Sequence, residues 1–147
     1  MEKDKYDIDR FVKAHSYSYN AALKELKKGQ KESHWMWYIF PQVNGLGYSY
    51  YADKYAIKSL EEAEAYFSNE TLKAHYMELC GILDALDAKY VDDVFPIPDD
   101  LKFRSSLTLF FLVTEEPLLK KLLNKYFDGD MCQHTVKIVK KWRKTNA

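Results

Sequence analysis

The sequence has no long apolar run and few of the residues that interrupt regular structure. No segment approaches the ~20 consecutive apolar residues that a transmembrane helix needs, so we expect no membrane span. The 147 residues include only five Gly and four Pro, and these fall between stretches with helical periodicity. No low-complexity linker divides the chain, and its length is typical of one domain. The sequence therefore predicts a single domain over residues 1–147.

An excess of charge of either sign is also missing. Lys and Arg number 22, and so do Asp and Glu, so the formal net charge is zero at pH 7. A nucleic-acid-binding surface usually appears as a basic excess, so we expect no nucleic-acid partner. The basic run VKIVKKWRK near the C-terminus is an exception, but the dipole of a helix also favours basic residues at its end. With 47% hydrophobic residues and no net charge, the chain does not have the composition of a disordered protein.

Cysteine is scarce, and the histidines are dispersed. Cys80 and Cys132 form no motif together, and the charged N-terminus, MEKDKYDIDR, has no apolar core of a signal peptide. We therefore expect a cytoplasmic protein with free thiols. The four histidines are far apart in the sequence, and none is spaced from a cysteine as zinc ligands are. The sequence predicts no metal site and indicates no cofactor.

Apolar residues at helical spacing are abundant. The first such segment starts after Asp7, a residue suited to an N-cap, and stops at Gly29, where a glycine commonly ends a helix. Ser59 opens a capping box, SLEE, and Asn69 is suited to cap the next helix. The run 101–113 is apolar enough for a strand, but its leucines and the preceding Asp-Asp pair favour a buried helix. We predict an all-α fold: a single compact domain of six to eight helices in orthogonal multihelical packing rather than a simple bundle.

The stretch SHWMWYIFPQ, residues 33–42, concentrates aromatic and polar side chains. If it is helical, His34 and Trp37 lie on one side and Trp35 on another, so one indole can fill the core while the other lines a cavity. A buried imidazole or indole N–H needs a hydrogen-bond partner, and an inert core would use Leu and Phe instead. The motif therefore predicts a polar-lined pocket that includes Gln42, with a purely structural core as the alternative reading.

A second group of polar residues lies in the run KFRSSLT. On a helix, Lys102, Ser105 and Ser106 lie within one face or at its edge. An ammonium and two hydroxyls can hold a phosphate or a carboxylate. Alternatively, the hydroxyls bond to carbonyls four residues earlier and allow close helix packing. We predict that this helix packs beside the motif, so that Lys102 and Ser105 face the same cavity as His34.

Four segments stand out by their rarity and their order along the chain: SHWMWYIFPQ, the GLG after it, YAIKSLEEAEAYF and DDLKFRSSLTLF. Together they resemble a bacterial family of unknown function, DUF1810. The resemblance covers almost the whole chain, from Tyr6 to the C-terminal segment. It implies a small, all-helical cytoplasmic domain, and it supplies no activity.

Three classes of function remain from the residues themselves, and nucleic-acid binding through VKIVKKWRK ranks last among them. The first is a binding or catalytic pocket for an anionic small molecule, nucleotide-like or a sugar phosphate. In it, Trp35 and Trp37 would stack on the base, His34 would act as general acid or base, and Lys102 with the serines would hold the anion. The alternative is a protein-interaction module with an exposed aromatic groove, in which the motif serves mainly as core. The sequence indicates no particular protein partner, and it does not decide whether the protein is an enzyme.

Overall fold

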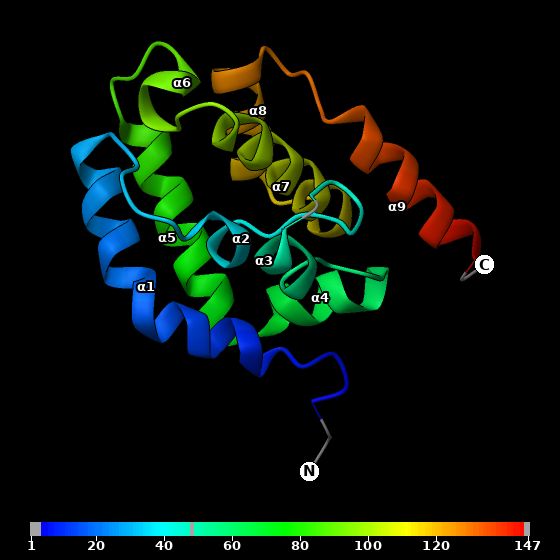
Figure 1. Cartoon of the computed structure of the whole chain (residues 1–147). Helices are drawn as coiled ribbons and strands as arrows, with labels where there is room; N and C mark the ends of the chain where they lie inside the picture. Colours follow the sequence, from blue (N-terminus) through cyan, green and yellow to red (C-terminus); the bar gives the residue numbers. More distant parts are fainter. Residues whose placement is uncertain (1–3, 48, 146–147) are drawn as a thin grey trace.

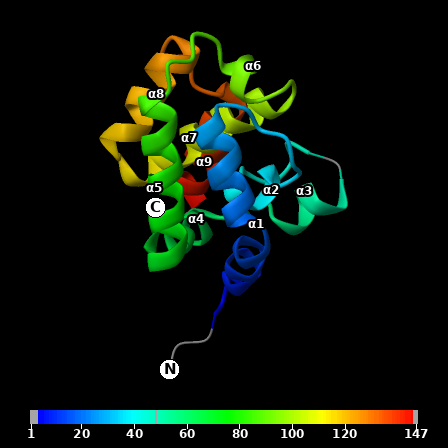
Figure 2. The same ribbon diagram turned by 90° about the vertical axis from the view of Figure 1, so that its left-hand side faces the viewer.

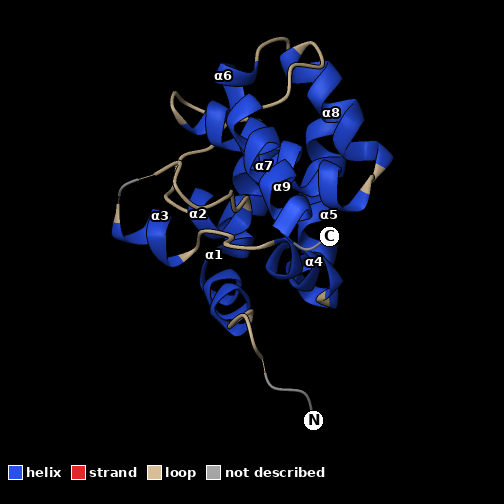
Figure 3. Cartoon of the chain, turned by 90° about the vertical axis from the view of Figure 1, so that its right-hand side faces the viewer, coloured by secondary structure: helices blue, strands red, loops and turns tan. Residues whose placement is uncertain are grey.

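The structure, a computed structural model, describes residues 4–47 and 49–145. Over these residues the regular secondary structure is entirely helical, which confirms the predicted all-α fold (Figure 3). Six helices are long: α1 (Asp9–Lys28), α4 (Leu60–Ser68), α5 (Glu70–Ala85), α7 (Asp99–Thr114), α8 (Pro117–Phe127) and α9 (Gln133–Thr145). Three are short: α2 (Met36–Ile39), α3 (Tyr50–Lys54) and α6 (Val91–Val94). None of the helices in the described ranges is both long and apolar enough to cross a membrane.

The centre of the fold is α7. Its middle residues, from Ser105 to Phe110, are all buried, because neighbouring helices cover this segment and its hydroxyl groups are hydrogen-bonded within the core. It packs against α4, α8 and α9, and it also contacts α2 and α6 (Figure 1). In a second layer α1 runs along α5, and both views show these two helices side by side (Figure 2). The result is a multihelical arrangement around one buried helix.

Local signals account for most helix limits. The hydroxyl of Ser59 accepts from the N–H of Glu62 at 3.1 Å, and the side chain of Asn69 accepts from the N–H of Leu72 at 3.0 Å. Gly29 ends α1 at φ 90°, a conformation that suits glycine. These caps lie where the sequence predicts them.

The predicted cap at Asp7 is wrong. The carboxylate of Asp4 instead accepts from the N–H groups of Ile8 and Asp9, at 2.7 and 2.8 Å. Asp7 itself has φ 51°, and its own carboxylate makes none of these bonds. An acceptor that folds back from outside the first turn satisfies the same orphan donors as a regular N-cap, so the pattern alone does not distinguish the two.

Candidate functional site

The motif at residues 33–42 is divided between the core and the surface. Trp35 is 1% exposed, whereas Trp37 is partly exposed and His34 is exposed. The indole N–H of Trp35 donates to the carboxylate of Glu25 at 3.0 Å. Trp35 is therefore a core residue with a satisfied polar atom, and the exposed side of the motif is carried by His34 and Trp37.

Glu25, on α1, anchors the start of the motif. Besides the indole, its carboxylate accepts from the N–H groups of Glu32 and Ser33, at 2.7 and 2.8 Å, and from the Ser33 hydroxyl at 2.6 Å. Burial raises the pKa of Glu25, but the hydrogen bonds from Ser33, Glu32 and Trp35 outweigh it and hold the pKa at about 2. A buried, charged carboxylate thus fixes the backbone from which His34 and Trp37 project.

The exposed side of the motif borders a cleft of about 420 Å³, which we call the aromatic cleft. The described residues that line it are Ala14, Tyr17, His34, Trp37, Tyr38, Tyr51 and Tyr55. They come from α1, from the motif, and from α3 and the residue after it, which are distant in sequence. Aromatic rings make up most of the wall, and there is no carboxylate among these lining residues.

Tyr38 forms the fixed part of this wall. Its hydroxyl and that of Ser18 are 2.5 Å apart, and its ring lies 5.1 Å from that of Tyr55. Its backbone carbonyl accepts from the imidazole of His15 at 2.9 Å and from the hydroxyl of Tyr66 at 3.2 Å. Contacts from α1 and α4 therefore hold this wall in place without a ligand.

A pair of histidines lies directly behind Tyr38. The Nδ1 atoms of His15 and His75 are 2.9 Å apart, which joins α1 to α5. Because a carbonyl can only accept, Nε2 of His15 carries the proton that Tyr38 receives, and its Nδ1 accepts the proton of His75. Burial lowers the pKa of His15 to about 4; the bond to the Tyr38 carbonyl opposes this shift, and the nearby His75 adds to it. Burial also lowers the pKa of His75, and Glu78 partly offsets this.

His34 is the imidazole that lines the aromatic cleft. Its ring lies 6.5 Å from the ring of Trp37, which in turn lies 5.2 Å from that of Tyr51. Within the described part of the chain, no hydrogen bond to the His34 ring is formed. The side chain of His34 is therefore available to a ligand. Because it is exposed, it does not need the hydrogen-bond partner within the protein that a buried histidine would require.

Lys102, on α7, contacts the motif through the ring of Trp37. Its ammonium lies 5.6 Å from the centre of the Trp37 ring and 3.4 Å from the carboxylate of Asp99. Helix α7 thus packs beside α2, as the sequence predicts. The residues that line the aromatic cleft include neither Lys102 nor Gln42. Gln42 is partly buried, and its backbone carbonyl accepts from the N–H of Ile57 at 2.9 Å.

The two serines of α7 do not share the cleft with His34. The hydroxyl of Ser105 is 2.9 Å from that of Thr135 on α9, and the hydroxyl of Ser106 is 2.9 Å from that of Tyr76 on α5. Both serines are buried. They join α7 to its neighbours, because a helix that is covered on every side must satisfy its hydroxyls inside the core.

Sequence reasoning missed the tyrosines of the cleft. Tyr17 is 88% exposed on α1, and Tyr51 and Tyr55 lie outside the motif, further along the chain. The doublet Tyr50-Tyr51 is the one local signal, because two adjacent tyrosines cannot both face the core from one helical turn. The contact with Trp37 depends on the position of α3 beside the motif, where the ring of Tyr51 lies 5.2 Å from that of Trp37.

Comparisons with known proteins agree with this structure. No curated protein is significantly similar to the chain. The crystal structure of the conserved hypothetical protein Rv1873 from Mycobacterium tuberculosis superposes with a TM-score of 0.91 and is 39% identical in sequence. That comparison covers 93% of this chain and 99% of Rv1873. A model of the family DUF1810, described as a protein of unknown function, matches residues 5–139, which include the motif, α7 and the whole aromatic cleft. The chain therefore belongs to the DUF1810 family.

Proposed function

We propose that this protein binds a planar, anionic small molecule of the nucleotide class in the aromatic cleft. The observation that carries the proposal is the cleft itself, a space of about 420 Å³ walled by Trp37 and four tyrosines with an unpartnered imidazole at its edge. Its size lies within the range of small-molecule sites, and its mixture of rings with a few polar groups is typical of them. Flat heterocycles stack on such rings, and the strength of the stacking depends little on which heterocycle is bound.

The charges around the cleft favour an anion over a cation. Aromatic cages also bind quaternary ammonium groups, but lysines of the chain itself already approach these rings. The ammonium of Lys102 lies 5.6 Å from the Trp37 ring, and that of Lys54 lies 5.4 Å from the Tyr55 ring. No carboxylate among the described lining residues would balance a bound cation. A ligand with negative charge gains from both lysines.

Within this proposal the residues have separate roles. Trp37 stacks on the ligand, His34 bonds to its polar edge, and Lys102 contributes positive charge through the Trp37 ring. Trp35, Ser105 and Ser106 stay in the core, because each is buried with its polar atom hydrogen-bonded. If the protein catalyses a reaction of the bound ligand, His34 is the candidate general acid or base. We place this function in the cytoplasm, where both unpaired cysteines would stay reduced.

The test is a binding experiment on two matched histidine variants. His34 is exposed, and among the described residues its ring has no hydrogen-bond partner, so His34→Ala should leave the melting temperature within about 2 °C of wild type. It should weaken nucleoside binding about tenfold, followed by fluorescence of the indoles or by calorimetry. His134→Ala removes a second exposed histidine from α9, away from the cleft, and should bind like wild type. Equal affinity for the two variants would contradict the role of His34.

A second candidate function is supported by the rim of the same cleft. Tyr17 and Tyr51, which line the cleft, are 88% and 49% exposed, and Tyr50, whose ring contacts that of Tyr51, is 72% exposed. Tyrosine is a preferred anchor at protein interfaces. In that case the cleft receives a side chain of a partner protein. The two functions separate in one experiment, because a protein partner would leave the indole fluorescence insensitive to nucleosides.

A further inference from the structure

Beside the aromatic cleft lies a second space of about 350 Å³, which we call the middle hollow. It shares Ala14, Tyr17 and Tyr55 with the cleft, so the two spaces border on the same side chains. The other described residues that line it are Asp7, Asp9, Arg10, Lys13 and Lys54. Polar and charged groups therefore begin where the aromatic wall ends.

A third space of about 500 Å³ continues from the middle hollow, with which it shares Asp7, Arg10 and Lys54. We call it the lysine hollow. Its remaining described residues are Lys5, Tyr6, Lys58, Ser59 and Glu62. The three spaces thus follow one another past α1 and α3, from rings at one end to three lysines at the other.

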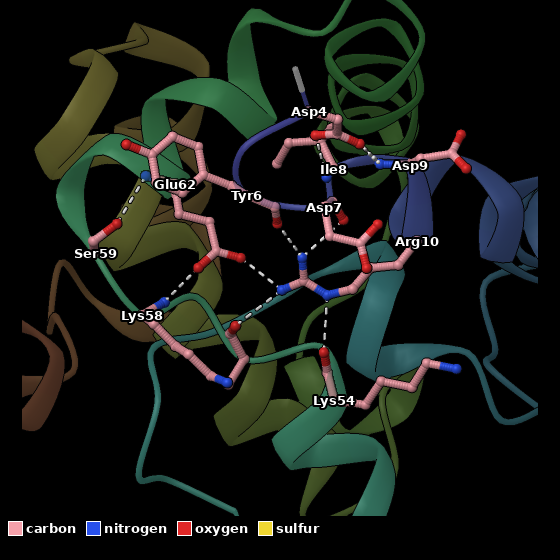
Figure 4. A network of polar contacts seen from close by, with 11 residues as sticks. Asp4, Tyr6, Asp7, Ile8, Asp9, Arg10, Lys54, Lys58, Ser59 and Glu62 are labelled. Carbon is pink, nitrogen blue, oxygen red and sulfur yellow. Dashed lines mark hydrogen bonds and ion pairs between the residues drawn. The ribbon is translucent and has the colours of Figure 1, made fainter.

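Arg10 lines both hollows, and Figure 4 shows its guanidinium hydrogen-bonded to residues from the start of the chain, to Lys54 and to Glu62. Its guanidinium donates to the carbonyl of Lys54 at 2.9 Å and to that of Ala56 at 3.3 Å, so it holds the backbone on both sides of Tyr55. Tyr55 is the wall shared by the cleft and the middle hollow, and Lys54 is shared by the two hollows. One side chain therefore sets the positions of both residues.

The remaining donors of Arg10 are also occupied. They donate to the carbonyls of Tyr6 and Asp7, at 2.6 and 2.9 Å, and to the carboxylate of Glu62 at 2.5 Å. A guanidinium has five N–H groups, and all five are used. Arg10 is consequently a positioning residue, and its charge is balanced by Glu62 within a nearly buried pair.

The lysines around it remain open to a ligand. Lys54 contacts only the rings of Tyr50 and Tyr55 through its ammonium, and among the described residues no carboxylate lies within ion-pair distance of it. With Arg10 and Glu62 balanced, the lysine hollow has Lys5, Lys54 and Lys58 against the single carboxylate of Asp7. An excess of ammonium groups in a concave space favours a phosphate group there.

The middle hollow has a different balance. The carboxylates of Asp7 and Asp9 equal the lysines there in number, and Lys13 lies 3.3 Å from Asp9. Such a space offers no net attraction to a phosphate. Carboxylates do accept hydrogen bonds from sugar hydroxyls, as acidic residues do in dinucleotide sites. The middle hollow therefore suits an uncharged polyol better than an anion.

From this order we propose that the three spaces form one site for a nucleoside polyphosphate, with the base in the aromatic cleft, the sugar in the middle hollow and the phosphates at Lys54 in the lysine hollow. The spatial order of rings, carboxylates and lysines along the three spaces matches the order of base, sugar and phosphate in such a ligand. This inference rests on the proposed function, because it needs the base to occupy the aromatic cleft.

The experiment compares nucleosides with their 5′-diphosphates and 5′-triphosphates, for each common base, by isothermal titration calorimetry. The phosphates should raise the affinity about tenfold or more over the nucleoside. Lys54→Met keeps the aliphatic packing on the tyrosine rings and should remove most of this gain, so that the affinity for the polyphosphates falls far more than that for the nucleoside.

Lys89→Met is the matched control. Lys89 is exposed between α5 and α6, and its ammonium lies 5.4 Å from the ring of Tyr90, the same distance as Lys54 from Tyr55. This variant should bind polyphosphates like wild type.

A second variant, Asp7→Asn, tests the middle hollow. Asparagine tolerates the positive φ of that position, and the substitution should reduce the preference for ribose over deoxyribose.

The outcomes are distinct. If nucleosides bind but phosphates add no affinity, or if Lys54→Met loses no more than Lys89→Met, the inference fails and the aromatic cleft remains the binding site. If neither nucleosides nor their phosphates bind, the proposed function fails with it.

Discussion

At the scale of single residues, the motif depends on one buried carboxylate. Glu25 receives four hydrogen bonds from residues 32–35, and these bonds keep the pKa of Glu25 at about 2 although burial would raise it. The aromatic residues of the motif are therefore held in place by an acidic side chain that no aromatic pattern would have suggested.

Glu25→Gln should destabilise the protein by about 2–3 kcal/mol at pH 7, because it replaces charge-assisted bonds and leaves donors unsatisfied. Since the pKa of Glu25 is lower in the folded state, its stabilising contribution is present above pH 4.5 and is lost as the pH falls toward 2. Chemical denaturation between pH 2 and 7 should thus show a weaker acid dependence for the variant.

The matched control for this experiment is Glu32→Gln. Glu32 is exposed and pairs at 2.6 Å with Lys28, which is also exposed. Because exposed pairs contribute little, this variant should unfold almost like wild type. If both variants lose similar stability, Glu25 is not the anchor that its bonds indicate.

At the scale of the elements, the histidine pair connects α1 to α5 and supports the wall of the aromatic cleft. His15 and His75 share one proton between their Nδ1 atoms, so protonation of both would place two charges 2.9 Å apart in the core. His15 donates to the backbone carbonyl of Tyr38, whose residue lines the cleft. Acid should therefore loosen the contact of these helices before it affects α7.

Protonation of this pair should make the protein sensitive to mild acid. The pKa of His15 falls from 6.5 in the unfolded chain to about 4 in the folded one. Between pH 6.5 and pH 4 the unfolded chain therefore binds a proton at His15 that the folded protein does not bind. The associated stability is complete above pH 6.5 and decreases by about 3 kcal/mol as the pH falls through 4.

His15→Gln should abolish most of this pH dependence, because an amide can still donate to the Tyr38 carbonyl and does not titrate. The free energy of unfolding, measured by urea denaturation from pH 7 to pH 4, is the readout. His134→Gln on α9 replaces an exposed histidine and should keep the slope of wild type. An unchanged slope for His15→Gln would show that the acid sensitivity originates elsewhere.

At the scale of the whole molecule, one hydrophobic cluster includes buried residues from the described helices on both sides of α7. Since α7 contacts most other helices, no group of helices can lose its core while the rest remains. We expect a helical far-ultraviolet circular dichroism spectrum and a single unfolding transition. The near-ultraviolet signal of buried Trp35 should disappear at the same denaturant concentration as the helical signal. Separate midpoints would show that part of the fold is independent.

The sequence by itself determined the class of fold and most of the helices. Caps such as Ser59 and Asn69 act within one turn, and the left-handed glycine at position 29 acts on its own backbone, so their effects are readable locally. The run from Leu107 to Val113 in α7, which is apolar except for Thr108, likewise favoured burial wherever the helix was placed. The separation of Trp35 from Trp37 was also predicted, although Trp35 precedes α2 with φ −136° and does not lie within a helix.

The tertiary structure alone decided the composition of the candidate site. Ser105 and Ser106 are near Lys102 on the same helix, yet α9 and α5 cover the serines while Lys102 reaches Trp37. Tyr17 and Tyr55 border one cleft with His34 only because the end of α3 lies against the start of α1, where Arg10 donates to the carbonyls of Lys54 and Ala56. A local pattern specifies which face of a helix is apolar, but the neighbour that covers each face depends on packing between distant segments, and a cleft forms where such segments meet.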